Sequence, residues 1–174
     1  MPKITFRRGL WVGVALLVLI VLPISTYVLT RTLPGSTPLE IQQSQYDLPG
    51  ELKRAKQLPQ WAELTQLSAK QNQPLTPAGM DRAGALTTHP NFFIRILALG
   101  VLGNSPDELK TSAAALVAAR MKDENVFVRL EAMNVLGRLR AREYLPELRE
   151  LLNSSDPDDR SGAKHALGMF GDGG

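Results

Sequence analysis

The sequence contains no cysteine among its 174 residues. This absence excludes disulfide bonds, a lipid-modified N-terminal cysteine, thiolate metal sites and a cysteine nucleophile, although it leaves the cellular compartment open. Serine-nucleophile motifs, glycine-rich phosphate loops and dinucleotide fingerprints are absent as well. We therefore expect a protein that is not an enzyme, carries no cofactor and has no small-molecule substrate.

Histidine is scarce too. Only His89 and His165 are present, and neither has a second ligand at the spacing that a zinc site requires. The acidic run from Asp156 to Asp159 lacks the alternating oxygen ligands, the central glycine and the distal glutamate of a calcium loop. It fits a helix start better, because Pro157 suits the first turn and acidic side chains there complement the helix dipole. We expect no metal site.

An excess of charge of one sign is lacking outside the N-terminus. The chain has 20 basic and 17 acidic side chains, and setting aside Lys3, Arg7 and Arg8 leaves 17 of each. Binding to nucleic acid needs several lysine or arginine side chains placed on phosphates. The balanced charge of the remaining chain therefore predicts no nucleic-acid partner.

One long hydrophobic run is present, directly after the basic residues 1–9. Residues 10–29, LWVGVALLVLIVLPISTYVL, form twenty consecutive positions without a charge. A helix of this length spans about 30 Å, the thickness of the hydrocarbon core of a bilayer. Trp11 and Tyr27 lie near its two ends, where aromatic side chains favour the interface. We expect a transmembrane helix over residues 10–30, inserted in the lipid bilayer.

The charges that flank this run predict its orientation. Three basic residues precede it, whereas only Arg31 follows closely. The positive-inside rule then makes the tail 1–9 cytoplasmic and the C-terminal domain periplasmic or otherwise extracytoplasmic. The alternative is a cleaved signal peptide, against which the lack of an Ala-x-Ala-like site argues. Gly9 and Gly13 form a GxxxG spacing that can seat a second membrane helix, so both are candidate partner contacts.

A proline-rich stretch follows. Prolines disfavour helix at the preceding residue, so we expect residues 31–58 to form a linker, with helical patterning returning near Glu51. Two further helices are predicted, one starting at Pro59 and one running from Pro77 to about Thr88. We interpret this pair as a degenerate leading repeat, or as a cap for the units that follow.

One short pattern is then written three times. In each copy an arginine is followed three residues later by an alanine, and a Leu-Gly pair closes the copy. The arginines are spaced by 34 and then 31 residues, a period typical of stacked helical units. The repeated residues are Arg95, Arg129 and Arg160, then Ala98, Ala132 and Ala163, and finally Gly103, Gly137 and Gly168.

Each part of the pattern has an expected role. The small alanine lets a neighbouring helix approach, and the closing glycine suits a left-handed residue at a helix C-terminus. The arginines should form a ladder along the stack. Two interpretations of this ladder are open: bonds to carbonyls or acids of neighbouring units, or contacts with an acidic partner. Repetition at equivalent positions favours the structural interpretation.

Residues 91–168 resemble the HEAT-repeat family, in particular the bacterial repeats also seen in phycobilisome-lyase-like proteins. The second copy and its following helix, NVFVRLEAMNVLGRLRAREYLPELRELL, carry the resemblance most strongly. The third copy departs from it, since Asp159 stands where Ile94 and Val128 stood. The resemblance implies an α-solenoid that binds proteins. We therefore expect an all-α fold, with one transmembrane helix followed by a short solenoid of HEAT-like repeats over residues 59–174.

Together these features favour a non-catalytic, membrane-anchored scaffold or accessory subunit, one that docks to integral membrane subunits and stabilises their complex. Two alternatives remain: a bilin-lyase-like HEAT-repeat enzyme or chaperone, and a free exported protein-binding module. No closing helix follows the third copy, so an apolar side of it should lie uncovered. Leu167, Met169 and Phe170 are the candidate partner contacts there.

Overall fold

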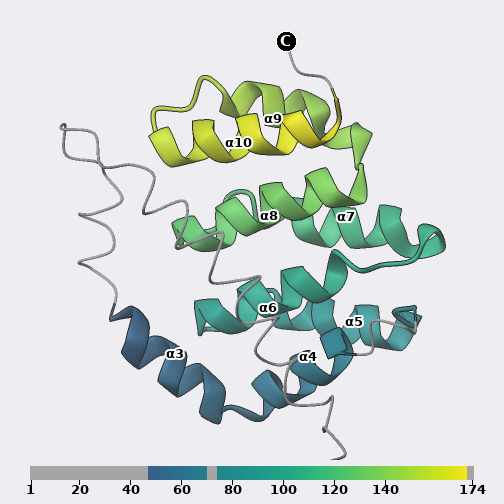
Figure 1. Ribbon diagram of the computed structural model, residues 1–174, viewed down its shortest axis with the longest axis vertical. Coiled ribbons are helices and arrows are strands. Elements are labelled where there is room, and N and C mark those ends of the chain that lie inside the picture. The colour runs from purple at the N-terminus through teal and green to yellow at the C-terminus, as the bar shows by residue number, and fades with distance from the viewer. Residues whose placement is uncertain (1–46, 70–73, 172–174) are drawn as a thin grey trace, which may run out of the picture. The chain divides into compact units, whose positions relative to one another are not determined.

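The computed structural model describes residues 47–69 and 74–171, and every regular element in these ranges is a helix (Figure 1). The tail 1–9, the expected membrane span 10–30 and its GxxxG pair lie outside the described residues. Within the described ranges, no helix is both long enough and apolar enough to cross a membrane. The all-α fold with helices packed in repeat-like pairs is confirmed for this part of the chain.

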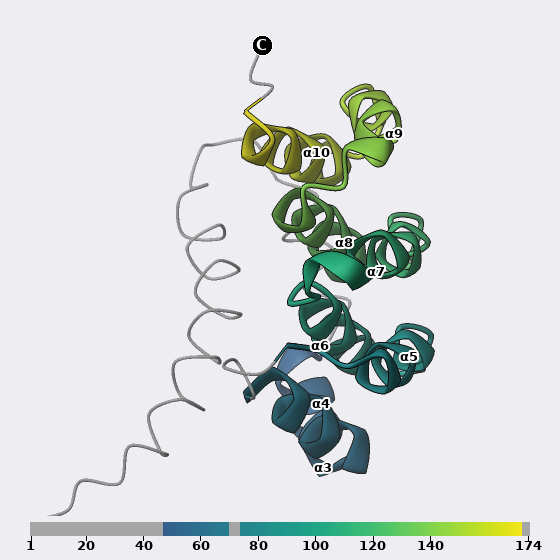
Figure 2. The ribbon, with the colours of Figure 1, turned by 90° about the vertical axis from the view of Figure 1, so that its right-hand side faces the viewer.

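The helices stack in two layers (Figure 2). One layer contains α6, α8 and α10, each packed on the next, while α5, α7 and α9 form the second layer beside them. Helices α3 and α4 cover the α6 end of the stack. The elements are α3 (Leu48–Gln57), α4 (Pro59–Ala69), α5 (Pro77–Leu86), α6 (Phe92–Leu102), η1 (Asp107–Leu109), α7 (Lys110–Ala118), α8 (Val126–Leu139), η2 (Arg142–Tyr144), α9 (Leu145–Leu151) and α10 (Pro157–Met169).

Helix α3 corrects the expected extent of the linker. The prolines predict a linker over residues 31–58, yet the chain is helical over Leu48–Gln57. The Asp47 side chain accepts a hydrogen bond of 3.0 Å from the Gly50 N–H, and Pro49 lies in the first turn, where its missing N–H costs nothing. The proline therefore starts this helix instead of preventing it.

Helices α6, α8 and α10 begin in the same way. The residue before each helix, Asn91, Asn125 or Asp156, accepts a hydrogen bond from the backbone N–H two residues later. The residue two places before that cap accepts a hydrogen bond from the N–H of the cap itself. These second acceptors are His89 Nδ1 at 3.1 Å, Asp123 Oδ1 at 3.0 Å and Ser154 Oγ at 3.1 Å. Three different side chains thus build the same turn.

The alanines of the repeat lie in the core. Ala98, Ala132 and Ala163 are all fully buried. Large apolar side chains of the same units are fully buried as well, among them Leu99, Leu102, Met133, Leu136 and Leu148. A larger residue at an alanine position would have to displace a neighbouring helix, because cores are packed at close to crystal density.

The closing glycines have a different role from the expected one. Gly103 has φ of −64°, and Gly137 and Gly168 lie within α8 and α10, so none of the three is a left-handed cap. The left-handed residue at the end of α8 is instead Arg140, which follows Leu139 and has φ of 57°. A β-carbon on Gly137 would lie 3.1 Å from the Ala166 carbonyl oxygen and 2.8 Å from Met169 Sδ. The glycine is needed because α10 approaches α8 closely at this point.

Alanine at Gly137 should therefore destabilise the domain, whereas alanine at Gly100 should not. A β-carbon at Gly137 meets backbone that cannot move freely, and overpacking of this kind costs about 1–3 kcal/mol. A β-carbon at Gly100 meets none of the described residues within 4 Å, so Gly100→Ala should gain about 0.5–1 kcal/mol from helix propensity. Urea unfolding of the two variants measures the difference. Equal effects would contradict the close approach at Gly137.

Candidate protein-interaction site

Arg95 forms the first rung of the arginine ladder. Its Nη1 donates to the carbonyl oxygens of His89 at 3.0 Å and Pro90 at 3.2 Å. Its Nη2 donates to Asp123 Oδ1 at 2.8 Å, and the two side chains are only 7% and 6% exposed. Glu124 lies 3.5 Å from the same nitrogen, but its side chain is 87% exposed. The buried Arg95–Asp123 pair thus connects the first unit to the start of the second.

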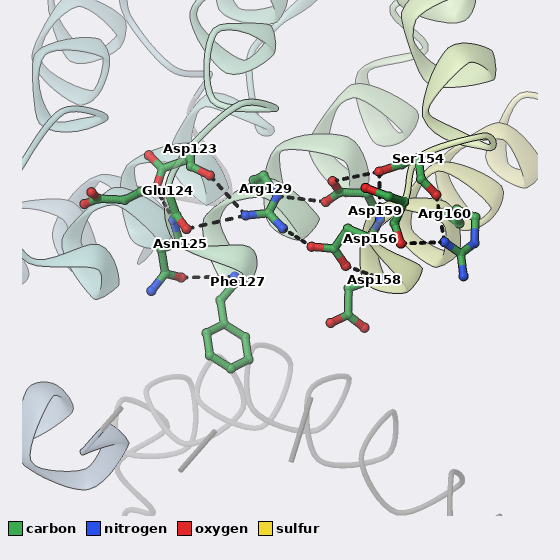
Figure 3. A network of polar contacts seen from close by, with 11 residues as sticks. Asp123, Glu124, Asn125, Phe127, Arg129, Ser154, Asp156, Asp158, Asp159 and Arg160 are labelled. Atoms are coloured by element: carbon green, nitrogen blue, oxygen red, sulfur yellow. Dashed lines mark hydrogen bonds and ion pairs between the residues drawn. The ribbon is translucent and has the colours of Figure 1, made fainter. Parts of the chain in front are cut away.

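Arg129 repeats this arrangement one unit later (Figure 3). Its Nη1 donates to the carbonyl oxygens of Asp123 at 3.2 Å and Glu124 at 3.4 Å. Its Nη2 lies 2.6 Å from Asp156 Oδ2 and its Nε 2.8 Å from Asp159 Oδ1. The guanidinium is therefore held by carbonyls of its own unit and by two carboxylates of the next. Its hydrogen bonds to the carboxylates are charge-assisted, so they are stronger than bonds between neutral groups.

Arg160 keeps only half of the pattern. Its Nη1 donates to the carbonyl oxygens of Ser154 at 2.7 Å and Ser155 at 3.0 Å, as in the other two units (Figure 3). No carboxylate within residues 47–69 and 74–171 pairs with it, and the residue is exposed. Of the two interpretations of the ladder, bonding between units describes Arg95 and Arg129, while Arg160 faces outward.

Sequence reasoning missed the acidic half of the ladder. The sequence pattern pairs neither Asp123 nor Asp156 with an arginine, and it makes Asp159 a departure from the repeat. The structure makes Asp159 a partner of Arg129. The available signal was the acid at or just before each cap, which lies 28 residues after Arg95 and 27 residues after Arg129.

Of the candidate partner contacts at the end of the solenoid, two lie in the core of the described structure. Leu167 is 7% exposed and Phe170 is 4% exposed, so both side chains pack inward. Met169 is half-buried, with its sulfur beside Gly137. These side chains are turned inward because α10 packs against both α8 and α9. Among the described residues, the one large apolar side chain that counts as exposed is Leu152, at 39%.

A shallow hollow lies beside the first rung of the ladder. It has a volume of about 260 Å³ and is lined by Glu51, Pro90, Phe92, Arg95, Glu124 and Asn125. Glu51 Oε2 accepts a hydrogen bond of 2.9 Å from Asn91 Nδ2, which ties α3 to the cap of α6. The lining holds charges of both signs and no nucleophile. Among the described residues, no group of three potential metal ligands comes together.

Glu131, on α8, is the acidic group whose environment disfavours its charge. Burial raises the pKa of its carboxyl, while Arg138, with Nη2 at 3.6 Å, and the Asn134 amide oppose the rise. Between α4 and α5, the hydrogen bond from Arg82 lowers the pKa of Glu63. The second pair is exposed and joins α4 to α5, so it contributes little to stability.

The repeat geometry agrees with the comparison to known families. Residues 81–172 match a family model described as HEAT repeats. The chain belongs to the HEAT-repeat family. No curated protein and no solved structure matches it. HEAT repeats generally mediate binding to other proteins, so the solenoid described above is a protein–protein interaction module.

Proposed function

We propose that this HEAT-repeat chain is a non-catalytic accessory subunit of a larger membrane protein complex. Residues 10–30 anchor it in the bilayer, and the solenoid lies outside the cytoplasm, where it docks to an integral membrane subunit and stabilises the assembly. The observation that carries the proposal is a run of twenty uncharged residues in the same short chain as a protein-binding module.

The composition of the solenoid supports a docking role. Several of its polar side chains form helix caps or bonds between units, as the ladder residues Arg95 and Arg129 illustrate. The outer surfaces of the described solenoid are faces of helices that are already formed, so no loop has to become ordered there on binding. Preorganisation of this kind lowers the entropic cost of association.

Membrane fractionation followed by mild detergent extraction tests the proposal. We expect the full-length tagged chain to sediment with membranes and to recover at least one integral membrane protein in stoichiometric amount. Leu19→Arg places a charge at the centre of the span, which costs about 2.5–3.5 kcal/mol of insertion free energy, and should shift the chain out of the membrane fraction. A wild-type chain that remains in the soluble fraction and lacks its first residues would instead support a free exported module.

Topology gives a separate prediction. Because Lys3, Arg7 and Arg8 precede the span and only Arg31 follows closely, everything from Thr30 onward should lie outside the cytoplasm. Protease added to intact spheroplasts should then digest the solenoid, while a cytoplasmic marker protein stays intact. Full protection of the solenoid, lost only after lysis, would reverse the assigned orientation.

A further inference from the structure

The outer side of α10 has features through which the inner repeat units pack on one another. No described unit packs on this side of α10. Four residues define this distal face: Pro157, Arg160, Lys164 and Gly168. Arg160, Lys164 and Gly168 are spaced by four and four residues, so they lie on one side of the helix. The corresponding side of α6 packs against α8, and that of α8 packs against α10. The distal face is therefore where a further helix would stack.

Comparison with the inner units shows what this face has retained. A β-carbon on Gly103 would lie 3.2 Å from Val135 of α8, and one on Gly137 would lie 3.1 Å from Ala166 of α10. A β-carbon on Gly168, at the equivalent place, meets no described residue within 4 Å. The glycine that permits close helix approach is thus present, and no residue within 47–69 and 74–171 fills the space above it.

The same comparison shows what has changed. The positions equivalent to Lys164 are Leu99 and Met133, and both are fully buried between units. Lys164 is exposed, and it follows Arg160 by one helical turn. The distal face is therefore cationic where the inner contacts are apolar. A neutral apolar helix would leave both charges desolvated and unpaired, which is unfavourable.

Arg160 shows where an acidic group of a partner would bind. Its Nη1 is fixed by two carbonyls, as in Arg95 and Arg129, whose Nη2 atoms bind carboxylates of the following unit at 2.8 and 2.6 Å. In Arg129 those carboxylates belong to the cap and first turn of the next helix. The guanidinium of Arg160 is thus held in the orientation in which the inner arginines receive an acidic helix start.

We propose that the distal face of α10 binds the acidic first turn of a helix in the partner subunit. A partner carboxylate occupies at Arg160 the place that Asp156 occupies at Arg129, a second acid pairs with Lys164, and Gly168 lets the partner helix approach closely. This inference rests on the proposed function, because it names the surface through which the docking occurs. Two cations one turn apart fit a carboxylate pair, whereas a nucleic acid needs a longer basic track.

A carbodiimide cross-link tests the contact directly. This reagent joins an amine to a carboxylate only where the two touch. Membranes that contain the tagged full-length chain are treated with it, and the cross-linked peptides are identified by mass spectrometry. The expected product joins Lys164 to an aspartate or glutamate in the first turn of a helix in another protein. A link from Lys164 to Glu40 or Asp172 of the same chain, or no link at Lys164 in a complex that does form, would overturn the inference.

Charge reversal supplies a second readout. Lys164→Glu removes no hydrogen bond of the described structure, so it tests the surface without unfolding the domain, and it should reduce the recovered partner by at least about tenfold. Arg160→Glu should do the same. Lys122→Glu, an identical charge change at an exposed residue between α7 and α8, should leave recovery unchanged. If Lys164→Glu recovers the partner as fully as the wild-type chain does, the inference about the distal face is wrong and the proposed function still stands. If the wild-type chain recovers no partner, the proposed function itself is wrong.

Discussion

Replacement of Asp123 by alanine is expected to be the most damaging single truncation in the ladder. The change leaves the Arg95 guanidinium buried, with its Nη2 deprived of the carboxylate at 2.8 Å. It also removes the acceptor of the Asn125 N–H, which starts α8. Loss of one partner from a buried ion pair costs about 3–5 kcal/mol, a large part of the stability of a small domain. Chemical denaturation monitored by circular dichroism measures the loss.

Glu124→Ala is the matched control for this experiment. Glu124 is the neighbouring acid, lies 3.5 Å from the same arginine nitrogen and is 87% exposed. Exposed pairs contribute little, so this variant should unfold at nearly the same denaturant concentration as the wild-type chain. If the two variants lose the same stability, the Arg95–Asp123 pair does not connect the units as described.

Ala132→Arg is expected to have an effect of similar size for a different reason. Ala132 is fully buried at the centre of α8, so the new side chain must either displace a packed helix or bury an unpaired charge. Overpacking and an uncompensated charge together cost on the order of 3–5 kcal/mol, enough to unfold a marginal domain. Thermal unfolding should show a much lower melting temperature, or no cooperative transition.

The control for this change is Ala115→Arg on α7. Ala115 is exposed, so arginine there projects into solvent and keeps good helix propensity. A melting temperature close to that of the wild-type chain is expected. If Ala132→Arg melts as Ala115→Arg does, then the alanine of the repeat does not face the core and the repeat register is wrong.

The architecture could be predicted from the sequence because it follows from residue spacings within each helix. The arginine-to-alanine spacing and the recurrent Leu-Gly pair place equivalent residues on equivalent faces, and Ala98, Ala132 and Ala163 are all fully buried. Pro59 and Pro77 also mark the starts of α4 and α5 correctly. A regular spacing of this kind reflects the period of the α-helix and does not depend on contacts between units.

What could not be predicted depends on contacts between units. The role of Gly137 follows from the distance to Ala166, which lies in another helix. The burial of Phe170 follows from the way α10 packs against α8 and α9. The distal face could be recognised as polar only once the structure showed that Leu99 and Met133, the residues equivalent to Lys164, are buried between units. These are tertiary facts, and no local spacing encodes them.

The size of the particle that mild detergent releases from membranes is the most direct test of the central claim. The chain has a mass of 19.1 kDa, so a free subunit and a subunit of a large assembly separate clearly on a native gel. We expect the wild-type chain to migrate in a particle several times heavier than its own mass plus detergent, and Lys164→Glu to release it as a small species. A wild-type chain that migrates alone, in cells that express it at its natural level, would contradict the account.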